Sequence, residues 1–164
     1  MNTKPKLLWI GDIVAKTGFA RVTENVLPFI KDDFDITVLG NNWWGDPSPL
    51  QKIYTMYPSS NRFQTAPFGE ERIREIVMKI EPDIIFTIND MWIVNEQYKQ
   101  IQDMHKDGRF KFVGYVPMDS YNWVGCLTDT ANDWDGIVSY TEFGAREFIK
   151  AGIEKPIAVI PHGV

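Results

Sequence analysis

Hydrophobic residues along the chain follow two alternating patterns, short β-rich apolar runs and stretches with helical spacing. The run Ile84–Ile88 is apolar except for Thr87, which is typical of a strand buried on both faces of a parallel sheet. Alternation of such runs with helices predicts βαβ units, an α/β fold and a mostly parallel sheet with helices on both faces. The predicted strands are Lys6–Ile10, Phe34–Leu39, Ile53–Tyr57, Ile84–Ile88, Phe110–Val116, Gly136–Tyr140 and Ile157–Ile160.

Helices are predicted where apolar residues recur three or four positions apart. The first should begin after Thr17, which is suited to cap its N-terminus, and should close or kink near its last turn at Pro28. The last should stop at Gly152. The residues that mark the helices are Phe19, Val22, Val26, Phe29 and Ile30; Ile73, Ile76, Val77 and Ile80; Tyr98, Ile101 and His105; and the segment Phe143–Ala151.

Composition and charge narrow the class of protein. With 44% hydrophobic residues in 164, the chain has material for one compact domain over residues 1–164. A lone Cys126 excludes an internal disulfide, and no apolar run is long enough for a signal peptide or a membrane span, so a cytoplasmic protein is expected. The net charge is −5 and no basic residue falls between Lys111 and Arg146, so nucleic acid is not an expected partner.

Ligands of open parallel sheets bind beyond the carboxyl ends of the strands, where the strand order reverses. After the first predicted strand comes GDIVAKTGFAR, in which Gly18 at a helix start would let backbone N–H groups approach a phosphate. Lys16 and Arg21 would add positive charge there. The segment is neither a GxGxxG nor a Walker A motif, so a dinucleotide or ATP site is not supported. The alternative, a glycine that only makes the strand-to-helix turn, stays open.

Two carboxylates follow strands that should be neighbours in the sheet. Asp90 comes after the strand at 84–88 and Asp119 after the strand at 110–116, so both could face one crevice. Such a pair is compatible with a glycosidase, and each aspartate could instead cap the helix that follows it. The two histidines and the cysteine lack metal-ligand spacing, so no metal site is expected.

Aromatic residues gather in and beside the loops at the predicted strand ends. Their rings could stack on a sugar ring or an apolar acceptor, or they could pack in the core, and both alternatives stay open. Two of them lie in the irregular segment 41–68, and a loop of that length inside a compact domain is usually functional. These residues are Trp43, Trp44, Trp92, Tyr121 and Trp123.

Five segments stand at the predicted strand ends in this order: TGFARVTENVLP, EPDIIFTINDMW, GYVPMDS, SYTEFGAREFIKAG and VIPHGV. Together they resemble the N-terminal domain of GT-B glycosyltransferases, in particular the nucleotide-sugar enzymes of glycosyltransferase family 4, over nearly the whole chain. The resemblance implies a Rossmann-like, doubly wound acceptor-side domain, one half of a GT-B fold. It also implies a C-terminal donor-binding domain absent from this chain, into which the family's chain crosses near the VIPHGV segment.

The resemblance further implies transfer of a sugar from a nucleotide sugar to an unknown acceptor, with retention of anomeric configuration and without a metal or other cofactor. In that mechanism the donor phosphate helps to take the acceptor proton, so this domain would mainly orient the acceptor and exclude water. By position, the resemblance implies that Gly18 lies against the donor diphosphate, where Lys16 and Arg21 are the nearby basic residues. It implies that Asp90, Asp119 and Tyr121 line the acceptor pocket near the anomeric carbon, with Asp119 the candidate for catalysis, and that Glu142 and His162 lie at the cleft floor and interdomain linker. Further candidates for the acceptor, from their places in or beside the strand-end loops, are Trp43, Trp44 and Trp92.

The chain departs from the family pattern at two places. Many family members have a double glycine where this chain has Thr17-Gly18, and a histidine near the position of Asp119.

The alternative to a glycosyltransferase domain is a standalone Rossmann-like ligand-binding or protein-interaction module without catalysis. That module should be self-contained, without exposed apolar patches at its C-terminal edge, with Trp43, Trp44 and the acidic second half forming a partner surface.

Overall fold

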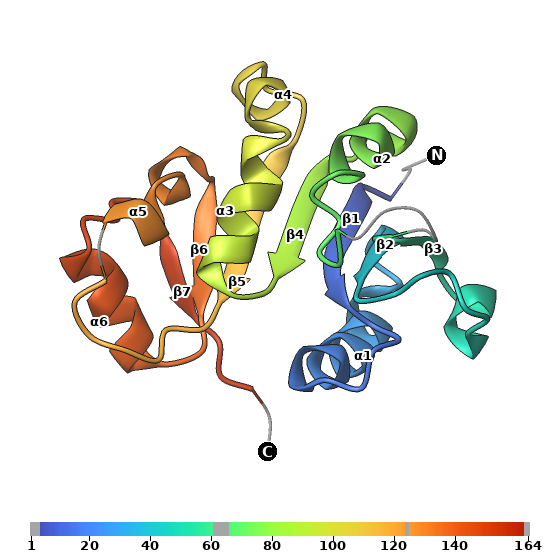
Figure 1. Ribbon diagram of the computed structural model, residues 1–164, viewed down its shortest axis with the longest axis horizontal. Helices are drawn as coiled ribbons and strands as arrows, with labels where there is room; N and C mark the ends of the chain where they lie inside the picture. Colours follow the sequence, from blue (N-terminus) through green and yellow to red (C-terminus); the bar gives the residue numbers. More distant parts are fainter. Residues whose placement is uncertain (1–3, 61–65, 124, 163–164) are drawn as a thin grey trace.

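The computed structural model describes residues 4–60, 66–123 and 125–162, and it has one seven-stranded sheet whose strands are all parallel (Figure 1). The strand order is β3-β2-β1-β4-β5-β6-β7, so the sheet is doubly wound and the predicted α/β fold class is confirmed. The strands are β1 (Lys6–Asp12), β2 (Asp35–Asn41), β3 (Thr55–Pro58), β4 (Ile84–Ile88), β5 (Lys111–Val116), β6 (Gly136–Ser139) and β7 (Ile157–Val159).

Helices cover the two faces of the sheet unequally. Successive side chains of a strand point to opposite faces, and in β1 Leu7 and Trp9 pack with Leu27 of α1 (Gly18–Ile30). Leu8 and Ile10 face the other way, into a core shared with four further helices. Those helices are α2 (Ile73–Ile80), α3 (Met91–Lys99), α4 (Gln102–Lys106) and α6 (Glu142–Lys150); the short elements are η1 (Pro49–Lys52), α5 (Gly125–Thr128) and η2 (Ala131–Asp133).

The two ends of α1 confirm the prediction made for them. The hydroxyl of Thr17 accepts a hydrogen bond from the N–H of Ala20 (3.1 Å), and the helix ends at Ile30, in the turn that contains Pro28. Local signals were therefore sufficient to place the helix that follows β1.

At the other end of the chain, residues 163–164 of the VIPHGV segment lie outside the described residues.

The helix expected to run through Ile101 is divided there, with α3 ending before this residue and α4 beginning after it. The guanidinium of Arg74 from α2 donates to the carbonyl of Gln100 at 3.0 Å, which satisfies a group that the break leaves free. Tyr98 and His105 remain in contact across the break, because the Tyr98 hydroxyl lies 2.7 Å from Nδ1 of His105. Tertiary contacts thus support a break that no glycine or proline marks.

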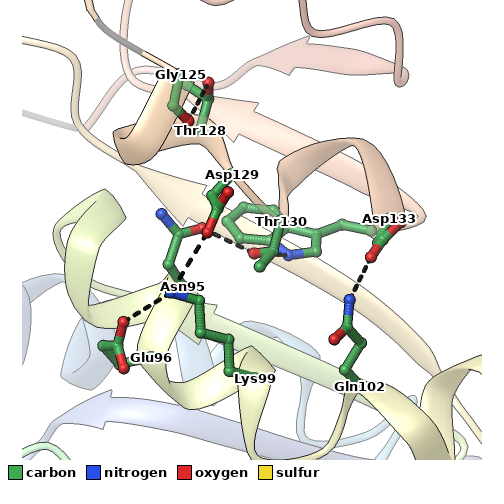
Figure 2. A network of polar contacts seen from close by, with 10 residues as sticks. Asn95, Glu96, Lys99, Gln102, Gly125, Thr128, Asp129, Thr130 and Asp133 are labelled. Carbon is green, nitrogen blue, oxygen red and sulfur yellow. Dashed lines mark hydrogen bonds and ion pairs between the residues drawn. The ribbon is translucent and has the colours of Figure 1, made fainter.

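A polar network joins α3 to the segment between β5 and β6 (Figure 2). The hydroxyl of Thr130 donates to Oδ1 of Asn95 (2.8 Å) and accepts from the indole N–H of Trp134 (3.1 Å), and all three residues are buried. Nearer the surface, Lys99 of α3 pairs with Asp129 at 3.4 Å. The network holds this segment against the helix whose N-terminus reaches the carboxyl end of β4.

Thr130→Val keeps the shape of the side chain and removes its hydroxyl. We expect the free energy of unfolding to fall by about 1–3 kcal/mol, because the buried indole N–H of Trp134 loses its acceptor. Urea unfolding followed by tryptophan fluorescence measures the loss. Thr130→Ser keeps the hydroxyl and is the matched control. A loss in Thr130→Ser with none in Thr130→Val would show that methyl packing, not hydrogen bonding, determines stability at this position.

Candidate functional site

The carboxyl ends of β1 and β4 form the switch point of the sheet. These strands are hydrogen-bonded neighbours, yet the helices that follow them, α1 and α3, lie on opposite faces. Such divergence opens a crevice beyond the strand ends, and here it is a cavity of about 440 Å³. The residues that line it are Asp12, Thr17, Gly18, Phe19, Asn42, Phe68, Asn89, Asp90, Trp92, Ile93 and His162.

Asp12, the last residue of β1, is the buried carboxylate of this cavity, with 2% of its surface exposed. It accepts hydrogen bonds from the hydroxyl of Thr17 (2.5 Å) and from the side-chain amide of Asn42 (2.9 Å). Asn42 has a φ of +53°, a left-handed conformation that asparagine adopts more readily than most residues. Together these contacts tie the ends of β1 and β2 to the start of α1.

Gly18 is the first residue of α1 and brings the helix N-terminus to the cavity. A Cβ built at this position would meet nothing within 4 Å, so packing does not require the glycine and the backbone stays open to a ligand. Lys16 and Arg21 are exposed close by, within the same turn and loop. The three residues predicted to bind phosphate therefore lie together at one helix end, where the dipole favours negative charge.

Asp90 occupies the N-cap position of α3 without capping it. Its side chain makes no hydrogen bond to the helix, whereas Thr17 and Thr141 do cap α1 and α6. Its backbone N–H is held by Oδ1 of Asn89 at 2.9 Å. Burial, and then the negative charge of Asp119, raise the pKa of Asp90 above its usual value. The prediction that the two aspartates follow neighbouring strands is confirmed, because β4 and β5 pair in the sheet.

Trp92 of α3 supplies an aromatic wall. Its side chain is 52% exposed and lines the cavity, and the ring of Phe68 meets it edge-on with 5.5 Å between the ring centroids. Phe68 is itself anchored, because the side-chain amide of Gln97 donates to its carbonyl at 2.7 Å. The cavity therefore has an indole on one side and carboxylates on another.

The other aromatic residues predicted for the acceptor lie elsewhere. Trp43 is 2% exposed and its indole N–H donates to the carbonyl of Asp46 (2.9 Å), so the prediction that its ring binds an acceptor is corrected to packing in the core. Trp44 and Tyr121 are 50% and 70% exposed, and neither lines the cavity. Tyr121 packs edge-on against Phe143 at 4.9 Å. The acceptor roles of Trp44 and Tyr121 stay predictions.

His162 lies where the site meets a second cavity, since it lines both. Its ring centroid is 4.0 Å from that of Tyr140, and its Nε2 is buried without a hydrogen-bond partner among the described residues. Burial lowers the pKa of His162, which keeps the imidazole neutral at pH 7. Glu142, in contrast, begins α6, is exposed and lines neither cavity.

The second cavity, of about 790 Å³, is apolar and lies on the α1 face of the sheet. Beyond β1 this face has little helical cover, so side chains of β4, β5 and β6 stay partly open there. Its walls include Trp9, Phe86, Tyr115, Val138 and Ile160.

Several residues of the first cavity were not singled out from the sequence. Asp12 and Asn89 could have been identified from the sequence, because each is a polar residue at the end of an apolar strand, where ligands of parallel sheets bind. Asn42 lay in the irregular segment that was noted only for its tryptophans. Phe68 carried no local signal, since it reaches the cavity from the long connection between β3 and α2.

The described part of the chain has neither a cluster of metal-ligating side chains nor a helix that could span a membrane. No group of three or more His, Cys, Asp or Glu residues there could hold a metal ion. No helix there is long and apolar enough to cross a membrane.

Comparison with known proteins gives a likeness of fold. No family model matches the sequence, and no curated protein matches it. A solved structure matches the fold: a UDP-glucosyltransferase from Polygonum tinctorium capable of glucosylating indoxyl, in complex with 3,4-dichloroaniline. It has a TM-score of 0.57 at 9% identity, covering 100% of this chain and 54% of that one. The likeness shows a shared Rossmann-like fold alone, over about half of that enzyme's length, and it does not extend to membership of glycosyltransferase family 4.

Proposed function

We propose that this chain is the acceptor-side domain of a glycosyltransferase that moves a sugar from a nucleotide sugar to an acceptor, with retention of configuration. One observation carries the proposal: Gly18, Asp90, Trp92 and His162 line a single cavity at the switch point of a fold shared with a UDP-glucosyltransferase. A separate donor-binding domain would complete the enzyme, so we expect no appreciable turnover by this chain alone. The proposed reaction uses no metal or cofactor, and the lone cysteine favours a cytoplasmic enzyme.

The proposed roles follow from the charges around the cavity. The N-terminus of α1 at Gly18, with Lys16 and Arg21, would hold the donor diphosphate. Asp119 is the proposed catalytic residue, and Asp90 beside it would orient the acceptor hydroxyl. The raised pKa of Asp90 makes its carboxylate a better proton acceptor than an ordinary aspartate. Positioning of the acceptor and exclusion of water are the main contributions expected of this domain.

The standalone binding module is less well supported. It was expected to close its own core, with a partner surface that included Trp43. The structure instead has an open apolar cavity of about 790 Å³ beside Ile160, which is 53% exposed, while Trp43 is buried. An open apolar cavity at the edge of a fold is where another domain or protein can pack. We therefore favour the transferase domain.

Titration of the ¹⁵N-labelled chain with UDP and UDP-glucose tests the proposal. We expect saturable shifts of the amide resonances of Gly18, Asp90 and Asp119. Lys16→Ala should weaken UDP binding about two- to fivefold, as removal of one exposed charge near a helix N-terminus does. The control, Lys31→Ala, removes a lysine at the opposite end of α1 and should leave the affinity unchanged. The absence of shifts at all three amides would contradict the proposal. Equal losses of UDP affinity in Lys16→Ala and Lys31→Ala would also contradict it.

A further inference from the structure

We infer that the acceptor is an uncharged, sugar-like ring that stacks on Trp92 and donates hydroxyl hydrogen bonds to Asp90. The inference rests on the proposed function and adds the chemical class of the acceptor. Its first support is size: the cavity of about 440 Å³ lies in the lower part of the range of small-molecule sites, about 300–1,000 Å³. That volume suits a compact polar ring better than a long apolar chain.

The second support is an aromatic wall whose orientation is set before a ligand arrives. Trp92 keeps 52% of its surface exposed, and the edge-on contact with Phe68 restricts how its indole can turn. Gln97 fixes Phe68 in turn, because it donates to the Phe68 carbonyl (2.7 Å) and accepts from the hydroxyl of Thr87 (2.8 Å). An indole held in this way offers a flat apolar surface to the C–H face of a sugar ring without an ordering cost.

The third support is the charge of the polar walls. Asp12 and Asp90 line the cavity, and Asp119 is near enough to Asp90 to interact with it. No lysine or arginine is among the lining residues of the described structure, and His162 is held neutral by burial. Carboxylates accept hydrogen bonds from hydroxyl groups and repel phosphates or other carboxylates. An anionic acceptor would therefore meet negative charge at the Asp12 and Asp90 walls, whereas the N-terminus of α1 at Gly18 is the proposed place of the donor diphosphate.

The fourth support is that the carboxylate of Asp90 is free to bind. Aspartate is among the best N-cap residues, yet this side chain makes no hydrogen bond to α3 or to any other described residue. Its partly buried oxygens therefore lack donors among the described residues. Hydroxyl groups of a ligand lying against Trp92 would supply them, since Trp92 is in the first turn of the same helix.

A matched pair of probes tests this inference. Methyl α-D-glucopyranoside is neutral, and glucose 6-phosphate carries the same ring with an anion. We expect the glycoside to shift the indole N–H resonance of Trp92 with a Kd of about 1–10 mM. Glucose 6-phosphate should bind about tenfold more weakly, and this gap should narrow in high salt and in Asp90→Asn. Trp92→Ala should weaken glycoside binding about tenfold.

Phe29→Ala is the matched control, because Phe29 is an aromatic residue that is 84% exposed and lies outside the cavity lining; it should leave glycoside binding unchanged. Glucose 6-phosphate binding as tightly as the glycoside would overturn the inference, and so would the absence of a saturable glycoside shift at Trp92. A UDP titration of the same sample separates the two proposals. UDP shifts at Gly18 without glycoside binding would overturn the acceptor class alone, whereas glycoside binding without UDP shifts would count against the transferase.

Discussion

Trp134→Ala is expected to lower the free energy of unfolding by about 3–5 kcal/mol, the usual cost of truncating a large buried aromatic residue. Trp134 is fully buried, packs 5.4 Å from the ring of Phe112 and lies against Gly114 of β5, where a Cβ would come within 2.6 Å of the indole. Truncation would leave a cavity beside the sheet and remove a donor from Thr130. Urea unfolding followed by far-UV circular dichroism measures the change.

Phe29→Ala is the control for this prediction. Phe29 is also a large aromatic residue, but it is 84% exposed on α1, so its truncation should change stability by no more than about 0.5 kcal/mol. A similar loss in both variants would show that burial of the indole is not what stabilises the core. A small loss in Trp134→Ala would show that the surrounding residues collapse into the vacated space.

The sheet could be predicted because its signals are local. Ile84–Ile88 lies between β1 and β5 in the sheet, and its run, apolar except for Thr87, coincides with β4 at both ends. Likewise the Thr17 hydroxyl can cap the N-terminus of a helix, and Pro28 disfavours continuation of a helix, whatever the surrounding fold. The break at Ile101 could not be predicted in this way, because its partner, Arg74, is distant in the sequence and no local residue opposes a continuous helix.

The candidate site was predictable where it depends on chain topology and not where it depends on packing. Gly18 and Asp90 were identified because carboxyl strand ends meet at one edge of any parallel sheet. Trp43 and Trp44 are adjacent and identical in type, yet the first is 2% and the second 50% exposed. The difference arises because Trp43 packs onto Gly40, where a Cβ would lie 3.1 Å from its ring. No property of the two tryptophans themselves could distinguish them.

Asp135, which precedes β6, organises the opposite end of the sheet from the candidate site. It accepts hydrogen bonds from the N–H of Phe112 (2.8 Å), from Lys111 (2.9 Å) and from Nε2 of His105 (2.7 Å). Donation from Nε2 leaves Nδ1 of His105 to accept from the Tyr98 hydroxyl at 2.7 Å. Burial acts to raise the pKa of Asp135, but these hydrogen bonds outweigh it and hold the pKa below its usual value.

Asp135→Asn is therefore expected to lower the free energy of unfolding at pH 7 by about 1–3 kcal/mol, because the amide cannot accept all three charge-assisted hydrogen bonds. The sign of the pH dependence follows from the depressed pKa. The stabilisation is present above the unfolded-state pKa of about 3.9 and is lost as the pH falls through the lower folded-state pKa. The difference between wild type and variant should shrink below about pH 4, as measured by urea unfolding across pH.

Asp103→Asn separates this effect from a surface ion pair. A hydrogen bond from Arg74 lowers the pKa of Asp103 to about 2, but both side chains are largely exposed, so salt should screen their interaction. The effect of Asp103→Asn should therefore vanish in high salt, whereas that of Asp135→Asn should persist, because the Asp135 side chain is 27% exposed and bonded to the backbone of β5. A loss in Asp135→Asn that stays constant down to pH 2 would show that the carboxylate charge does not contribute. The hydrogen-bond geometry alone would then account for the stabilisation.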